Sequence, residues 1–364
     1  MTVLPAKPLN LLDDVADLTA ALMDIESVSG NEAAIADAVE QALKGLDHLE
    51  VVRDGDSIMA RTSLGRSERV ILAGHLDTVP LPSVPGSRGT VPSSRDGDVL
   101  YGRGATDMKG GVAVQLALAA RLADPSRDIT FIFYDHEEVD ASLSGLGRLE
   151  KSFPEWLKAD FAILLEPTDG TVEGGCNGTM RFQARTTGKA AHSARAWMGE
   201  NAIHGAAEIL VRLRDHQPAT VRVEGLDYRE SLNAVKIHGG TAGNVIPDSA
   251  VVEINYRFAP DKNPAQAEAY VRELLDGFDL VLTDSSAGAR PGLDRPAAAS
   301  FVAAVGAEPK PKYGWTDVAR FSALGIPAVN FGPGDALLAH SDNEHVSAGA
   351  IRQCLSALET WLAA

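Results

Sequence analysis

Cysteine, positive charge and long apolar runs are all scarce in this chain of 364 residues. Only Cys176 and Cys354 are present, and because two cysteines make no disulfide framework, a reduced cytoplasmic chain is the simplest interpretation. Lys and Arg number 33 against 50 Asp and Glu, and the resulting formal charge of -17 argues against nucleic acid or a membrane surface as a partner. No run reaches the roughly 18 apolar residues of a membrane-spanning helix, and no signal peptide is recognisable at the N-terminus.

The rest of the composition is that of an ordinary globular protein, with 45% hydrophobic and 23% charged residues. At about 100–200 residues per domain, the length predicts two domains. A bound metal ion could still make one cleft locally positive, so the acidic charge does not exclude a small anionic substrate.

Helical and strand patterns alternate in the first part of the chain. The expected helices are 11–22, 31–43 and the nearly all-apolar 111–122, and the expected strands are the apolar runs 70–73, 129–134 and 161–165. Strands that alternate with helices favour right-handed crossovers and a mostly parallel sheet.

The pattern changes after Gly174. Polar and apolar residues alternate in several short segments, as in half-exposed strands. The expected strands are 181–187, 219–223, 232–238 and 250–258, with helices at 201–214 and 265–275. The first pattern returns near residue 290, with helices at 298–305 and 348–362 and a strand at 328–331. We therefore expect an α/β domain in two parts, 1–177 and 289–364, interrupted by a smaller α+β domain at 178–288.

Polar residues follow the expected buried strands, where open α/β sheets place their sites. The run 70–73 leads into His75-Leu76-Asp77, 129–134 into Asp135-His136-Glu137-Glu138, and 161–165 into Glu166; Asp107 precedes the apolar helix, and His340 follows a Gly-rich turn. The two histidines with Asp107, Glu138 and Glu166 form a nitrogen and oxygen ligand set, which zinc, manganese and cobalt accept.

Each of these residues also has an ordinary structural interpretation. His75 could be a hydrogen-bonding residue at a strand end, and Asp107 could cap the helix that follows it. The Glu137-Glu138 pair could be surface charge. Their coincidence at successive strand ends predicts a common site. In His75-Leu76-Asp77 alternate residues face the same side, so Asp77 could hold one imidazole nitrogen while the other binds metal.

The ordered segments GHLDTVP, YGRGATDMKGG, DHEEV, LEPT and the late Ala339-His340 resemble the signature of the M20 metallopeptidases. The resemblance covers nearly the whole chain. It implies a zinc-peptidase-like α/β domain, with a mixed, mostly parallel sheet flanked by helices, and an inserted α+β dimerisation or lid domain. It also implies a homodimer formed through the inserted domain.

The resemblance further implies two zinc ions per subunit, for which Co²⁺ or Mn²⁺ can substitute. His75 and Glu166 would hold one ion, Glu138 and His340 would hold the other, and Asp107 would bridge them.

The resemblance implies roles for six more residues. Glu137 would be the general base, Asp77 would orient His75, and His192 would stabilise the oxyanion from the partner subunit. The expected substrate-binding residues are Asn244, Arg257 and Gly332.

Within the family, further segments such as LDYRESLNAV, GNVIPD and NYRFAP resemble enzymes that remove succinate from N-succinyl-L,L-diaminopimelate, a small anionic substrate. Another N-acyl-amino-acid deacylase or dipeptidase is the alternative. A silent member that only binds ligands is a third, although the intact Glu137 argues against it. Two residues depart from the family pattern: His136, which should face away from Glu137, and Trp315, where relatives often carry a smaller side chain.

Overall fold

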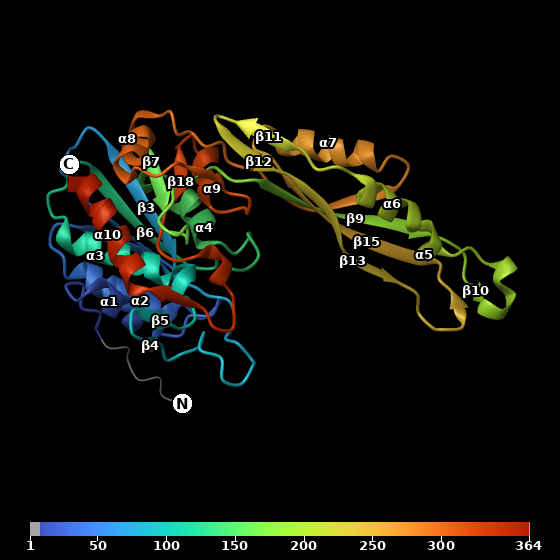
Figure 1. The fold of residues 1–364 in the computed structure, drawn as a ribbon, viewed down its shortest axis with the longest axis horizontal. Helices are drawn as coiled ribbons and strands as arrows, with labels where there is room; N and C mark the ends of the chain where they lie inside the picture. The colour runs from blue at the N-terminus through green and yellow to red at the C-terminus, as the bar shows by residue number, and fades with distance from the viewer. Residues whose placement is uncertain (1–7, 364) are drawn as a thin grey trace. The chain divides into compact units, whose positions relative to one another are not determined.

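In the computed structural model, which describes residues 8–363, the chain folds into two compact units (Figure 1). Within the described residues, unit 1 comprises 8–174, 292–310 and 320–363, and unit 2 comprises 175–291 and 311–319. The chain thus leaves unit 1 twice, whereas the expected boundaries contain one insertion. The second excursion joins unit 2 through hydrogen bonds, since the Lys312 carbonyl accepts from the Asn177 amide at 3.2 Å.

Among the described residues, unit 1 is built around an eight-stranded sheet in the order β1-β2-β6-β3-β7-β18-β8-β17. The strands are β1 (Glu50–Asp54), β2 (Ser57–Arg61), β3 (Arg69–His75), β6 (Asp128–Tyr134), β7 (Phe161–Leu164), β8 (Glu173–Gly174), β17 (Lys310–Pro311) and β18 (Ala328–Asn330). β3 runs parallel to β6 and β7, and β18 runs parallel to β7. The predicted parallel centre is confirmed, and its strands β6 and β7 are mostly apolar because both of their faces are buried.

Helices flank this sheet. They are α1 (Val15–Met23), α2 (Ala33–Lys44), α3 (Gly110–Arg121), α4 (Gly145–Ser152), α8 (Pro296–Val305), α9 (Val318–Ala323) and α10 (Ala348–Ala363), with short helical turns η1 (Ala105–Lys109), η2 (Pro154–Leu157) and η4 (Ala336–Leu338). α3 packs between α1 and α10 and is buried from Gly110 to Ala119, which explains its nearly all-apolar sequence. No helix within residues 8–363 is long and apolar enough to cross a membrane.

Two glycines let α3 approach the strands closely. A Cβ atom on Gly111 would overlap the carbonyl oxygen of Leu165, just after β7, and one on Gly74 of β3 would overlap the Gln115 side chain of α3. Because α3 begins against these strand ends, the preceding turn η1 lies beside them and carries Asp107 with it.

A small sheet joins two segments that are far apart in the sequence. It contains β4 (Ser94–Asp96), β5 (Val99–Tyr101) and β19 (His345–Ser347), in the order β19-β5-β4. His345 is paired with Tyr101, so the segment that leads to Asp107 lies beside the segment that follows His340.

Unit 2 contains a four-stranded antiparallel sheet among its described residues, in the order β13-β15-β9-β16. Its elements are β9 (Gly178–Thr187), β10 (Ala191–His192), η3 (Ser193–Met198), α5 (Ala202–Gly205), α6 (Ala207–Asp215), β11 (Thr220–Val223), β12 (Leu226–Arg229), β13 (Ser231–Gly239), β14 (Val245–Ile246), β15 (Ser249–Phe258), α7 (Pro264–Leu274) and β16 (Asp279–Ser286). Alternate residues of β15 pack into one core with α6 and α7, as the alternation in the sequence predicts.

Candidate metal centre

His75 is the last residue of β3, and its side chain is buried. Its Nδ1 atom lies 2.9 Å from the main-chain carbonyl oxygen of Asp77, and its Nε2 atom lies 3.0 Å from Oδ1 of Asp107. A carbonyl oxygen can only accept, so Nδ1 carries a hydrogen and donates it. This leaves Nε2 as the atom that can bind a metal ion.

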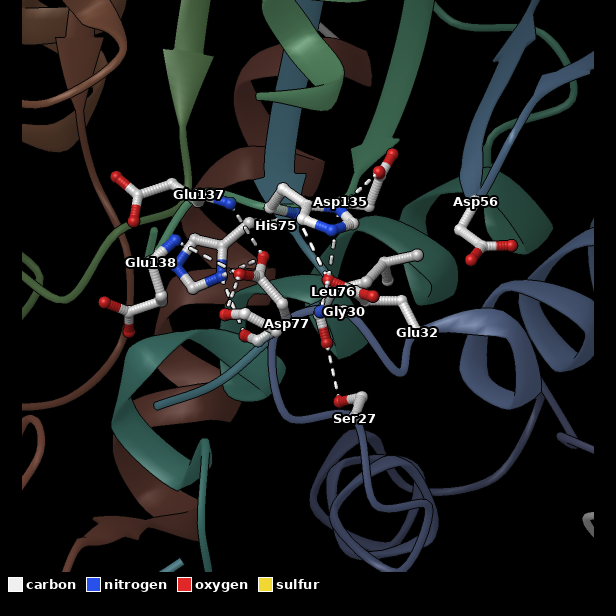
Figure 2. Close-up of polar contacts among 12 residues, drawn as sticks. Ser27, Gly30, Glu32, Asp56, His75, Leu76, Asp77, Asp135, Glu137 and Glu138 are labelled. Atoms are coloured by element: carbon white, nitrogen blue, oxygen red, sulfur yellow. Dashed lines mark hydrogen bonds and ion pairs between the residues drawn. The ribbon is translucent and has the colours of Figure 1, made fainter. Parts of the chain in front are cut away.

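Asp77 supports the site differently from our expectation. Its carboxylate Oδ1 is 3.6 Å from the imidazole, and its carbonyl group is the closer partner of His75. The carboxylate instead accepts the amide hydrogens of Glu137 at 3.0 Å and Glu138 at 3.1 Å (Figure 2). It also accepts the Ser29 hydroxyl hydrogen at 2.6 Å. Asp77 therefore orients the histidine through its main chain and holds the glutamate pair through its side chain.

Asp107 lies between two imidazoles. Its Oδ1 atom faces His75, and its Oδ2 atom is 3.3 Å from Nε2 of His340. Nε2 of His340 also lies 2.9 Å from Oε1 of Glu138. The end of β3, the turn after β6, η1 and the late His340 loop thus meet at one point, as the strand-end pattern indicates.

Three groups of possible ligands have donor atoms within 4.8 Å of one another. They are His75 with Asp107 and Glu166, His75 with Glu137 and Glu138, and Asp107 with Glu138 and His340. The groups share members, so all six side chains form one cluster, which suits two cations that share Asp107. Two imidazoles and four carboxylates without a thiolate match the preferences of Zn²⁺, Mn²⁺ and Co²⁺.

The charges in this cluster shift the pKa values of its members in opposite directions. Hydrogen bonds to Asp107 and Glu138 raise the pKa of His340 to about 10. Burial lowers the pKa of His75, but the hydrogen bond to Asp107 and the charges of nearby glutamates raise it by more. Burial raises the pKa of Asp107, but the two histidines lower it by more, so the net shift is downward. The carboxylates that raise the pKa values of the two histidines give the cluster a negative potential, which favours bound cations.

Two buried acids that the sequence analysis did not single out hold the ligand loops. Glu32 accepts the amide hydrogens of Gly30 at 2.9 Å and His136 at 3.3 Å, and Glu344 accepts those of the loop that carries Asp107. Neither acid belongs to a motif whose spacing indicates such a role. Because every residue except proline has a main-chain amide hydrogen, the sequence of the donating segment does not indicate such a bond.

His136 and Trp315, the two departures from the family pattern, make contacts of their own. His136 has a left-handed backbone (φ 58°), and its Nδ1 atom lies 2.7 Å from Asp135 and 3.4 Å from Glu32. Trp315, in unit 2, donates its indole hydrogen to the Ala287 carbonyl at 3.0 Å.

The three predicted residues in the inserted segment all lie in unit 2. His192 is exposed at the end of β10, and its Nδ1 atom accepts the amide hydrogen of Ala194 at 3.1 Å. Asn244 lies beside it, because its carbonyl accepts from the Ser193 amide at 2.8 Å.

Arg257 lies on β15 and donates Nε–H to Oδ1 of Asn255 at 3.2 Å. Burial and the nearby Arg181 lower the pKa of its guanidinium group, and no carboxylate within residues 8–363 forms an ion pair with it.

Gly332 lies in unit 1, next to Glu166. Its amide donates to Oγ1 of Thr168 at 3.1 Å, and a Cβ atom at this position would come within 2.5 Å of the Glu166 carbonyl oxygen. The structure thus brings Gly332 to the metal-ligand cluster, while its part in substrate binding stays a prediction.

Comparison with known proteins gives one consistent result. The family model for peptidase family M20/M25/M40 matches residues 71–364. A Mycobacterium tuberculosis protein provisionally assigned as the succinyl-diaminopimelate desuccinylase DapE is 52% identical over 97% of this chain and 99% of its own length. The succinyl-diaminopimelate desuccinylase of Corynebacterium glutamicum is 43% identical over 97% of both chains.

The fold also matches a solved structure. A Staphylococcus aureus tripeptidase superposes with a TM-score of 0.78 at 22% identity and covers 98% of each chain. The family match and the 52% identity to a relative show that this chain belongs to peptidase family M20/M25/M40, as a hydrolase of amide bonds.

Proposed function

We propose that this chain is a zinc-dependent desuccinylase that hydrolyses N-succinyl-L,L-diaminopimelate to succinate and L,L-diaminopimelate. The observation that carries the proposal is its high identity, over almost its full length, to two relatives that bear this activity in their names. The intact cluster at the strand ends supports a working hydrolase. Another N-acyl-amino-acid deacylase or a dipeptidase is the alternative. We place the enzyme in the cytoplasm, where its two buried cysteines would stay reduced.

The ligand cluster supports a dinuclear zinc centre in the proposed enzyme. His75 and Glu166 would hold one ion, Glu138 and His340 the other, and Asp107 both, because its two oxygens face the two histidines. Co²⁺ or Mn²⁺ would substitute, since the donors are nitrogen and oxygen. When bound, two such ions polarise an amide carbonyl and lower the pKa of a water molecule.

The acid-base and oxyanion roles fall to the chain's own residues. Glu137 would take a proton from the attacking water and return it to the leaving amine. The Asp77 carboxylate holds the Glu137 amide, which fixes the base next to Glu138. His192 would stabilise the oxyanion: its Nδ1 atom accepts a hydrogen bond, so the ring hydrogen sits on Nε2 and can be donated.

Substrate carboxylates would be held by Arg257 and Asn244, with Gly332 in the wall of the site. The guanidinium of Arg257 is half-buried, which suits it to bidentate capture of a carboxylate. The main chain at Gly332 passes so close to the carbonyl oxygens of Leu165 and Glu166 that no side chain would fit there.

The proposed enzyme is a homodimer that pairs through unit 2. β13 is an edge strand of its sheet, and Val235 and Ile237 on it are 55% and 48% exposed. Leu210 and Val211 of α6, which packs against β13, are also exposed. An exposed apolar edge strand favours pairing with another chain, and a two-fold axis lets both copies use the same surface.

The substrate assignment can be tested by kinetics on a small panel. We expect kcat/KM for N-succinyl-L,L-diaminopimelate to exceed that for N-acetyl-L-ornithine by about tenfold or more, because a charge-assisted hydrogen bond to the extra carboxylate is worth about 1.5–3 kcal/mol. A preference for acetyl-ornithine would favour the alternative deacylase. Metal-loaded protein that turns over no member of the panel would favour a binding protein.

The substitution Arg257→Lys tests whether the guanidinium group of Arg257 binds the extra carboxylate of the succinylated substrate. Lys cannot form the planar two-bonded clamp, so the variant should lose more kcat/KM with the succinylated substrate than with acetyl-ornithine. Arg222→Lys is the matched control, because Arg222 lies in the same unit and pairs with Asp227 on the exposed β11–β12 hairpin. Unchanged kinetics in Arg257→Lys would leave Arg257 a structural role only.

Glu137→Gln should keep its metal and lose activity. Removal of a general base typically costs about 10²–10⁴-fold in rate, so we expect kcat to fall by at least about 10². Metal content by mass spectrometry should equal that of the unsubstituted enzyme, because Glu138 and the other ligands remain. Glu155→Gln, an exposed acid paired with Lys158, serves as the control. Near-normal turnover with normal metal content would show that Glu137 is not the base.

Metal binding should release about two protons per subunit at pH 7.5, one from each imidazole. In chelator-treated protein both nitrogens of His75 face oxygen acceptors, and the pKa of His340 is about 10, so both rings are protonated. Because protons compete for these nitrogens below their pKa, Zn²⁺ affinity should weaken as pH falls. Calorimetric titrations in Tris and in phosphate should give heats that differ by the buffers' ionisation enthalpies, and equal heats would contradict the prediction.

The dimer and the role of His192 can be tested together by mixing two inactive variants. In a mixed dimer of His192→Ala and Glu137→Ala, one site has its own Glu137 and an intact His192 from its partner, so it should work. Random pairing makes about half of the dimers mixed, each with one working site, and activity should recover to roughly a quarter of that of the unsubstituted enzyme. Confirmed subunit exchange without recovery would show that His192 does not act across the interface.

A further inference from the structure

Glu344 is a fully buried acid that the proposed chemistry does not use. Its Oε1 atom accepts the amide hydrogens of Thr106 at 3.0 Å and Asp107 at 3.1 Å. Its Oε2 atom accepts from the Gly104 amide at 3.1 Å and from the Arg103 guanidinium at 2.8 Å. One carboxylate therefore collects three main-chain hydrogens from the loop that carries Asp107.

These amides need such an acceptor because of the shape of the loop. Gly104 has a left-handed backbone (φ 80°), and Asp107 and Met108 inside η1 are not helical, so no regular helix precedes Asp107. A buried amide without a partner costs free energy comparable to a lost hydrogen bond. If Glu344 were replaced, these amides would lose their acceptor, and the loop would shift to let them bind other acceptors.

Glu344 also belongs to the turn that follows His340. Its own amide donates to the Ser341 carbonyl at 3.3 Å, and Arg103 donates to the same carbonyl at 3.3 Å. The neighbouring His345 carbonyl accepts the Thr106 hydroxyl at 2.7 Å. The buried ion pair between Arg103 and Glu344 thus connects the loop that carries Asp107 with the turn that follows His340.

We propose that Glu344 is a positioning residue that sets the place of Asp107 relative to His340 and so tunes metal binding by the cluster. The inference rests on the proposed metal chemistry of this site. It follows from the contacts, because Asp107 donates its main-chain hydrogen to Glu344 and approaches His340 to 3.3 Å with its side chain. Loss of an outer partner of this kind typically weakens metal affinity or activity by about 10–100-fold.

Glu344→Gln keeps the size of the side chain but turns an amide group toward donors. Apo protein prepared with a chelator and titrated with Co²⁺ should bind the ion about 10–100-fold more weakly and with an altered visible spectrum. In metal-free protein, the amides of residues 102–109 should exchange hydrogen faster than in the unsubstituted protein. With the succinylated substrate, kcat should fall while KM changes little.

Asp128→Asn is the matched control for a purely structural effect. Asp128 is also a buried acid, it accepts the amide hydrogens of Leu64 at 2.8 Å and Arg66 at 3.0 Å, and it starts the strand β6 whose other end leads to Glu137. This control should lower the unfolding temperature without changing the Co²⁺ affinity or spectrum. Glu344→Gln combined with Arg103→Met removes the charge left unpaired, and it should restore stability while Co²⁺ binding stays weak.

Several results would overturn the proposal. One is Co²⁺ binding in Glu344→Gln that matches the unsubstituted protein; another is equal weakening in Asp128→Asn. A third is rapid hydrogen exchange at the Thr106 and Asp107 amides of the unsubstituted metal-free protein, which would show that Glu344 does not hold them. None of these readouts uses the substrate, so they stay valid if the chain proves to be a different amidohydrolase.

Discussion

The mutual repulsion of carboxylates is the constraint on which the rest of this structure depends. Four acids and two histidines form three overlapping groups, and within each group the possible ligand atoms lie within 4.8 Å of one another. Like charges this close oppose each other unless cations or fixed donors offset them. The raised pKa of His340 and the lowered pKa of Asp107 show that the histidines offset part of this repulsion, because hydrogen bonds between the rings and the carboxylates stabilise both charged forms. Every support of the site serves to keep these groups together.

The fold supplies that support in two ways. The central parallel strands are buried on both faces, so their ends are rigid, and Gly111 and Gly74 let α3 start directly against them. Buried acids then hold the loops that leave the sheet: Asp77 binds the amides of Glu137 and Glu138, and Glu344 binds those around Asp107. The loops are thus fixed by the protein's own main-chain bonds.

Much of the core of the site was predictable from the sequence, and the reasons are local. An apolar run followed by polar residues marks the end of a parallel strand, and such ends meet at one edge, so the sequence pattern alone places His75 and the glutamate pair together.

The expected helix at 201–214 was only partly right, because the chain forms two helices there, α5 and α6. Glu344 could not be foreseen, since its partners are amides 237 to 240 residues away and an amide has the same form in every sequence. The second excursion, 311–319, was missed for a similar reason: main-chain bonds hold it to unit 2.

The same amide bonds explain why this cluster can be a metal site and not simply a destabilising concentration of charge. A loop whose hydrogens are already taken by Asp77 or Glu344 has little freedom left to lose when an ion binds. The ordering cost of binding is then small, and most of the attraction between the ion and the carboxylates remains as affinity. The two imidazoles offset part of the repulsion until an ion displaces their protons. A centre of this kind is arranged by the fold in advance, and the metal enters a geometry that the chain has already set.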